Sequence, residues 1–249
     1  MWTLFKKEIS GFFSSLTGYV VIVVFLLLNS LFMWIIPGQF NVIGNGYSTL
    51  DSMFALAPWI FLFLVPAITM RMISEEKRAG TLELLYTRPV SELQIVLSKF
   101  LASWALVLLS LIPTLVFFWS VSRMGSTTGN IDTGGTWGSY IGLLFLGGIY
   151  AAIGLFTSSL TGNQIVAFIA AVFGSFLMYQ GFDFLSNIAG DGRTAFLISR
   201  LGIDYHYNSM SRGVLDSRDV LYFLMVMALF IMGTRTVLQQ RKKILQMMT

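Results

Sequence analysis

Six long apolar runs divide the chain, and short polar segments separate them. Each run could form a helix of roughly 20 apolar residues, which crosses hydrocarbon about 30 Å thick. Continuous apolar runs favour helices over the short alternating strands of a membrane β-barrel. The six predicted spans cover residues 19–36, 54–72, 91–121, 137–160, 163–185 and 219–238. The pattern therefore predicts an all-α polytopic membrane protein with a single transmembrane domain over residues 1–249.

Residues 1–16, which precede the first span, have the pattern of an amphipathic helix, with Lys7 and Glu8 on its polar side. The apolar positions fall within an arc of about 100° of a helical wheel: Trp2, Phe5, Ile9, Phe12, Phe13 and Leu16. This pattern predicts an interfacial helix that lies on the lipid bilayer, with a soluble cap helix as the alternative. No small-x-small cleavage signal follows the first span, which disfavours a cleaved signal peptide.

The composition agrees with a membrane protein and excludes several classes of chemistry. Hydrophobic residues make up 55% of the chain and charged residues 11%, whereas about a quarter of a soluble domain is charged. The chain has no Cys, so a disulfide, a thiolate metal site and a cysteine nucleophile are excluded. The net charge of +4 is spread over loops and termini, so no nucleic-acid partner is expected.

The basic residues beside the short loops predict the orientation, because such residues gather on the cytoplasmic side. With six spans, these residues fall on one side: Lys6, Lys7, Arg71, Lys77, Arg78, Arg88, Lys99, Arg241, Lys242 and Lys243. We therefore expect a cytoplasmic (inner) membrane protein with both termini and loop 73–90 in the cytoplasm. The predicted extracytoplasmic segment 186–218 is the exception to the rule, since it carries Arg193, Arg200, Arg212 and Arg218.

Groups that could perform catalysis are scarce. Asp51 and Asp183 sit only at the edges of predicted spans, so ion-coupled transport is disfavoured. The only histidine, His206, is interpreted as a surface hydrogen-bonding residue of the extracytoplasmic segment. No G-x-x-x-x-G-K-[ST] motif is present, so any ATP would be hydrolysed by another polypeptide. We therefore expect no enzyme activity, catalytic residue, metal or cofactor in this chain.

Charges gather in loop 73–90, which reads "ISEEKRAGTLELLYTRPV". The second span can continue as a polar helix until Gly80, Thr81 can cap a second short helix, and Pro89 ends it. That short helix has apolar residues that some other surface should cover: Leu82, Leu84, Leu85 and Tyr86. A short helix fixed between two spans could serve as the docking site of a peripheral motor protein. An interfacial helix resting on lipid headgroups is the alternative.

The run E-E-x-x-x-G-T-x-E-x-L-x-x-x-P in this loop resembles the loop between the second and third spans of ABC-2 type transporter permeases. The six-span layout and the amphipathic N-terminal helix are similar as well. The resemblance implies a permease subunit that docks on a separate ATPase subunit, which binds ATP and Mg. The residues that would form the coupling segment are Glu75, Glu76, Arg78, Gly80, Thr81, Glu83, Leu84, Leu85 and Pro89.

The stretch "YHYNSMSRGVLDSRDVLYFL" is similar to the GldF type of permease, which is associated with gliding motility. That narrower likeness implies an ATPase dimer of the GldA type and a second transmembrane subunit of the GldG type. A homodimer of permeases is the alternative arrangement.

The extracytoplasmic segment supplies candidate contacts with an outer partner, namely Tyr205, Tyr207 and Arg212. Residues 196–203 fit either a short helix or a plain loop. Spans four and five carry small residues at small-xxx-small spacing, such as Gly147 with Ala151, which predicts a tight helical hairpin. Two functions remain open at this point: coupling of ATP hydrolysis to export or envelope assembly, and mechanical transmission to an outer partner without any cargo.

Overall fold

The computed structural model describes residues 1–46, 48–86, 89–124, 131–190, 192–213 and 215–248. The described residues form helices and no strand, so the predicted all-α class is confirmed. Six stretches among them are long and apolar enough to cross a membrane: Leu16–Ile35, Asp51–Arg78, Glu92–Met124, Thr133–Leu160, Gln164–Ile188 and Ser217–Ile244. The chain is thus a multi-pass membrane protein.

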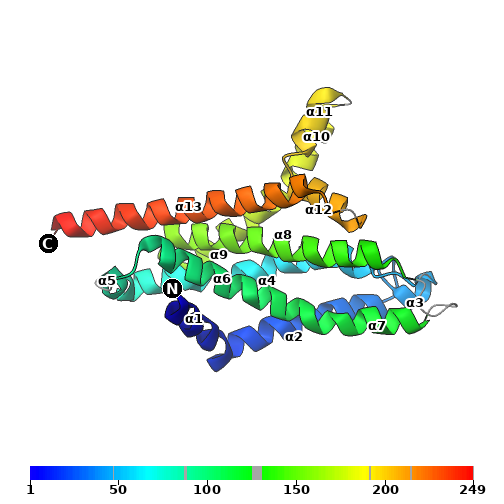
Figure 1. The fold of residues 1–249 in the computed structure, drawn as a ribbon, viewed down its shortest axis with the longest axis horizontal. Helices are drawn as coiled ribbons and strands as arrows, with labels where there is room; N and C mark the ends of the chain where they lie inside the picture. The colour runs from blue at the N-terminus through cyan, green and yellow to red at the C-terminus, as the bar shows by residue number, and fades with distance from the viewer. Residues whose placement is uncertain (47, 87–88, 125–130, 191, 214, 249) are drawn as a thin grey trace.

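The helices follow one another in a bundle whose long axis is horizontal in Figure 1. Their bounds are α1 (Trp2–Ser14), α2 (Leu16–Ser30), η1 (Leu31–Ile35), α3 (Val42–Asn45), α4 (Asp51–Arg78), α5 (Thr81–Tyr86), α6 (Glu92–Leu111), η2 (Ile112–Thr114), α7 (Leu115–Met124), α8 (Thr133–Leu160), α9 (Gln164–Phe176), η3 (Leu177–Gly181), α10 (Phe182–Ile188), α11 (Arg193–Ser199), α12 (Ile203–Ser211) and α13 (Ser217–Met248). Both termini and α5 lie toward one end of the bundle, and α3 and α12 lie toward the other, which we call the distal end.

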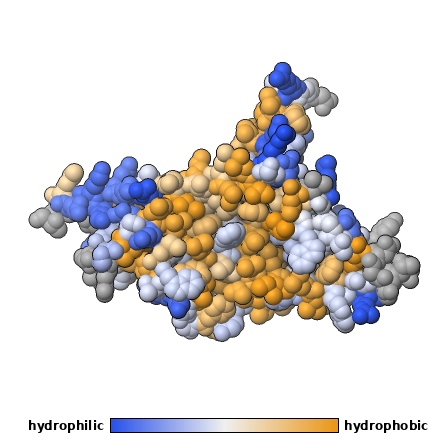
Figure 2. Space-filling model, viewed as in Figure 1, coloured by the Kyte–Doolittle hydropathy of each residue, from blue (hydrophilic) through white to orange (hydrophobic). Residues whose placement is uncertain are grey.

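Hydrophobic side chains cover the middle of the bundle, as Figure 2 shows in orange. Hydrophilic side chains gather at the end that holds the C-terminus. Because lipid tails favour apolar side chains and headgroups favour polar ones, this distribution fits a bundle that crosses a bilayer.

The spans differ from their predicted bounds where polar residues continue a helix. The last helix, α13, extends to Met248, although its predicted span ended at residue 238. The predicted fifth span, 163–185, changes direction within its bounds. There α9 follows the bundle, whereas α10 and α11 project crosswise from it (Figure 1). We call residues 182–199 the side arm. Hydropathy detects apolar length but contains no information on direction.

The central helix of the bundle is α8, which contacts α4, α6, α9, α12 and α13. Its glycines admit these neighbours at short range: Gly147 lies against Val107 of α6, and Gly154 against Thr69 of α4. The predicted hairpin of spans four and five thus describes only part of this packing. Small residues matter here because helices in lipid associate through close contact rather than through exclusion of water.

The distal end of α8 is tied to α12 by another glycine. A methyl group on Gly138 would overlap the backbone carbonyl oxygen of Met210, which belongs to α12. Gly134, one turn earlier, has more room, since its nearest neighbour would be Asp132 Oδ1 at 3.4 Å.

Gly138→Ala is therefore expected to push α12 away from α8 and to lower the free energy of unfolding by ~1–3 kcal/mol. Thermal unfolding in mild detergent, followed by near-UV circular dichroism, would measure the loss. Gly134→Ala is the matched control and should leave the melting temperature nearly unchanged. Equal melting curves for the two variants would contradict the close contact.

Candidate functional site

The junction between α4 and α5 is built around one glycine. Gly80 has φ +71°, a left-handed conformation that favours glycine, and it ends α4. The Thr81 hydroxyl donates to the carbonyl oxygen of Glu76 at 3.5 Å, so it contributes to the end of α4. The capping box predicted for the next helix is confirmed by the reciprocal bonds of Ser91 and Gln94.

The apolar side of α5 is covered largely by this chain itself. Leu82 is buried in the core, and Leu85 and Tyr86 are partly buried against it. The phenol of Tyr86 donates to the carbonyl oxygen of Leu238 in α13 at 3.2 Å. The prediction that these apolar residues await an external cover is therefore wrong for Leu82. The Leu84 side chain, like residues 87 and 88, lies outside the described residues.

The exposed side of this segment is polar. Glu75, Arg78, Thr81, Glu83 and Pro89 are all exposed. They present both signs of charge beside the α4–α5 junction. Charged groups at the rim of a contact guide orientation and partner choice, so this surface can fix the register of a docked protein.

Glu76 differs from its neighbours because it points into the protein. Lys99 of α6 is buried, and its Nζ lies 2.8 Å from Glu76 Oε1 and 2.9 Å from Glu8 Oε1 of α1. This buried ionic cluster joins α1, α4 and α6. The Glu76 carboxylate thus helps to balance Lys99, and its membership of the coupling segment stays a prediction.

Lys242 of α13 contacts residues of both α5 and α6. Lys242 Nζ lies 2.7 Å from Glu92 Oε1 and 5.8 Å from the centre of the Tyr86 ring. Burial raises the pKa of the Tyr86 phenol to about 12, so the ring remains neutral and able to donate its hydrogen bond. α13 thereby contacts both α5 and α6, the helices that precede and follow Pro89.

At the distal end, segment 186–218 is mostly helical. α11 covers part of the stretch 196–203 that the sequence left open, and α12 begins at its last residue. Tyr207 is only 4% exposed and donates to the carbonyl oxygen of Phe54 at 2.8 Å. It cannot contact an outer partner, so that prediction is wrong. Tyr205 and Arg212 are exposed.

His206 is buried rather than superficial, which also corrects the sequence interpretation. Its Nδ1 lies 2.7 Å from Asp219 Oδ1, and its Nε2 lies 2.9 Å from the carbonyl oxygen of Arg200. The ring stacks on Tyr222 with centroids 3.9 Å apart. This pair locks α12 to the start of α13.

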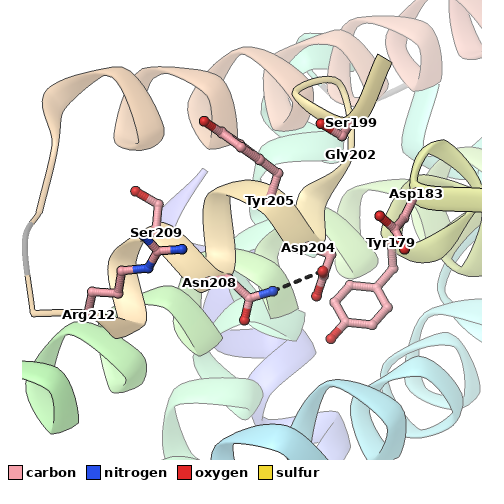
Figure 3. A pocket seen from close by; sticks show the side chains of 9 residues that line it. All are labelled: Tyr179, Asp183, Ser199, Gly202, Asp204, Tyr205, Asn208, Ser209 and Arg212. Atoms are coloured by element: carbon pink, nitrogen blue, oxygen red, sulfur yellow. Dashed lines mark hydrogen bonds between the residues drawn. The ribbon is translucent and has the colours of Figure 1, made fainter. Parts of the chain in front are cut away.

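A cavity of about 300 Å³ opens at the base of the side arm, and we call it the arm-base pocket. Six of its lining residues are Tyr179, Asp183, Asp204, Tyr205, Asn208 and Arg212 (Figure 3). Asn208 Nδ2 donates to Asp204 Oδ2 at 2.9 Å. Partial burial and the nearby charge of Asp183 raise the pKa of Asp204.

Sequence reasoning did not assign this pocket. Asp204 and Asn208 share one side of α12 because they are spaced four residues apart, and Arg212 at the C-terminal end of this helix continues the spacing, which is a detectable pattern. Tyr179 and Asp183 reach it from η3 and α10, and no local pattern connects them to α12. In the part of the chain that the structure describes, no group of three His, Cys, Asp or Glu residues could hold a metal ion.

The bundle and the α4–α5 junction define a multi-pass helical membrane subunit. A family model described as ABC-2 family transporter protein matches residues 4–199. The chain therefore belongs to the ABC-2 transporter family, whose membrane permease subunits work with an ABC ATPase subunit that is a separate component. Comparison with curated proteins gave no match.

The ionic cluster at Lys99 generates a stability prediction. Lys99→Met should leave Glu8 and Glu76 facing each other without a cation, at a cost of ~3–5 kcal/mol. Lys242→Met removes a more exposed pair and should cost only about 0–1 kcal/mol. Melting temperatures of the purified variants in detergent would compare the two. A small loss for Lys99→Met, similar to that for Lys242→Met, would show that the cluster contributes little to stability.

Proposed function

We propose that this chain is a permease subunit that couples ATP hydrolysis by a separate ATPase subunit to export or to assembly of envelope or gliding machinery. The observation that carries the proposal is α5. It is a short helix at the end of two spans, with a covered apolar side and an exposed polar side. ATP and Mg would bind to the partner, so this chain needs no cofactor of its own.

The exposed residues of the segment are the proposed docking contacts. Glu75, Arg78 and Glu83 would set the orientation of the ATPase, and Gly80 would fix the angle between α4 and α5. Leu85 is partly exposed and can add apolar contact area at the same surface. Leu84 remains part of the proposed coupling segment on sequence grounds alone.

Rigid connections would pass motion of the ATPase to the spans. α5 follows α4 in the chain and packs against it, and α6 is the next helix along the chain. Its Tyr86 contacts Leu238, and the Glu92–Lys242 pair connects α6 to α13. A displacement of α5 would therefore move three spans together instead of bending one loop.

We place α5 and both termini in the cytoplasm, with the protein in the inner membrane. The support is the concentration of Lys residues at the end of the bundle that holds α5. Arg193 of the side arm, and Arg200 directly after it, would then lie on the extracytoplasmic side.

The narrower proposal is a GldF-type permease with an ATPase dimer of the GldA type and a second transmembrane subunit of the GldG type. Its support is the sequence of residues 205–224, which lies beyond the stretch matched by the family. A homodimer of permeases is the alternative assembly.

A second candidate function is mechanical transmission to an extracytoplasmic partner without a moved substrate. The side arm favours it, because the arm projects from the bundle and exposes apolar residues such as Phe184, Ile188 and Phe196 (Figure 1). Tyr205 and Arg212 near its base could extend that contact.

Reversing the charge of Glu83 tests the docking surface. Glu83→Lys should lower permease-dependent ATP hydrolysis by about tenfold, equivalent to ~1.4 kcal/mol of lost interaction. The measurement is ATP hydrolysis by the complex purified in mild detergent, together with the amount of ATPase subunit that accompanies the permease. Asp216→Lys, an equally exposed reversal at the distal end, is the control. Unchanged hydrolysis in Glu83→Lys would remove that residue from the coupling surface.

A second variant tests the hydrogen bond between Tyr86 of α5 and Leu238 of α13. Tyr86→Phe keeps the ring but deletes the hydrogen bond to Leu238, which is worth ~0.5–1.5 kcal/mol. We expect the ATPase subunit to remain bound while permease-stimulated hydrolysis falls about threefold. Tyr19→Phe, at an exposed ring of α2, provides a matched control. Equal stimulation in both variants would contradict a role for this bond in coupling.

A further inference from the structure

We propose that the arm-base pocket binds an ammonium-bearing phosphate group of the phosphoethanolamine class, with the ammonium between Asp183 and Asp204 and the phosphate toward Arg212. This proposal is independent of the coupling function, because it concerns the opposite end of the bundle. The same chemistry occurs in a zwitterionic lipid headgroup and in a soluble molecule that carries phosphoethanolamine.

The carboxylate end of the pocket lacks a cation. Asp183 Oδ2 accepts a hydrogen bond from Gln180 Nε2 at 3.3 Å, and Asp204 accepts one from Asn208. These donors are neutral, and no ion pair of either carboxylate occurs among the residues that the structure describes. Two nearby carboxylates in a partly buried site repel each other, and a bound cation would relieve that repulsion.

An ammonium group suits this end better than a metal ion. Calcium takes six to eight oxygen ligands, whereas only two carboxylates converge here. The ring of Tyr179 forms part of the lining, and aromatic rings attract ammonium groups.

The other end of the pocket is suited to an anion. Figure 3 shows Arg212 on one side of Asn208 and the two carboxylates with Tyr179 on the other. Arg212 is exposed, and no ion pair holds its guanidinium within the described residues. A guanidinium can bind a phosphate through two parallel hydrogen bonds. A ligand with opposite charges at its two ends matches this separation.

The location of the pocket is that expected for a headgroup site. The side arm runs crosswise to the spans, and its exposed Phe184, Leu185, Ile188 and Leu197 would lie among lipid chains at the membrane surface (Figure 1). Its hydrophilic tip is visible in Figure 2. The pocket opens at the base of this arm, where lipid headgroups and polar solutes both have access.

The test measures ligand binding to the full-length protein by native mass spectrometry. Phosphatidylethanolamine, phosphatidylglycerol, soluble phosphoethanolamine and ethanolamine are the probes. We expect phosphatidylethanolamine to bind about tenfold more tightly than phosphatidylglycerol, and Asp204→Asn to remove that preference. Arg212→Gln should weaken phosphoethanolamine about tenfold while changing ethanolamine little. Asp216→Asn and Arg218→Gln are matched controls, since these residues do not line the pocket.

The outcomes separate the sources of the ligand. Competition between soluble phosphoethanolamine and the lipid would support a headgroup site, and Asp204-dependent binding of the soluble probe alone would support a polar solute. Equal binding of both lipids combined with no binding of phosphoethanolamine would overturn the proposal. So would wild-type binding in Asp204→Asn. Should that variant fail to fold, Asp183→Asn provides the same comparison from α10.

Discussion

Close contact between helix backbones is the constraint on which this structure depends. In lipid, apolar side chains gain little by leaving their surroundings, so helices associate through packing and a few hydrogen bonds. The glycines of α8 permit such packing against several neighbours, among them Thr69 of α4 and Met210 of α12. The Ser158 hydroxyl adds a polar connection, because it accepts from two amides of α4 and donates to the carbonyl oxygen of Met70. Contacts with α8 therefore position its neighbouring helices in the bundle.

Charged residues act at the two ends of the bundle in different ways. At the α5 end, Lys99 joins three helices through Glu8 and Glu76, and an exposed set of charges remains for a partner. At the distal end, the buried His206–Asp219 pair locks α12, while the arm-base pocket leaves two carboxylates without a cation. The Lys99 ion pairs at one end and the His206–Asp219 hydrogen bond at the other thus connect the helices, and charges without an ion pair mark the surfaces available for binding.

The structure corrects or extends the sequence interpretation of four residues for one shared reason. Glu76, Leu82, Tyr207 and His206 lie in polar or loop-like stretches, and each was interpreted from its local surroundings. Their partners lie 13 or more residues away in the chain: Lys99 for Glu76, Phe54 for Tyr207 and Asp219 for His206. By contrast, the Ser91 capping box was predicted correctly because both of its members lie within one helical turn.

The sequence alone determined the all-α class, the six spans and the helix break at Gly80. Apolar length, local capping and the conformational freedom of glycine are properties of short segments, so these features need no knowledge of the rest of the chain. Only the tertiary structure decided the central place of α8, the crosswise direction of the side arm, the inward turn of Glu76 and the existence of the arm-base pocket. Each of these requires residues from separate helices to meet, and a one-dimensional pattern does not contain that information.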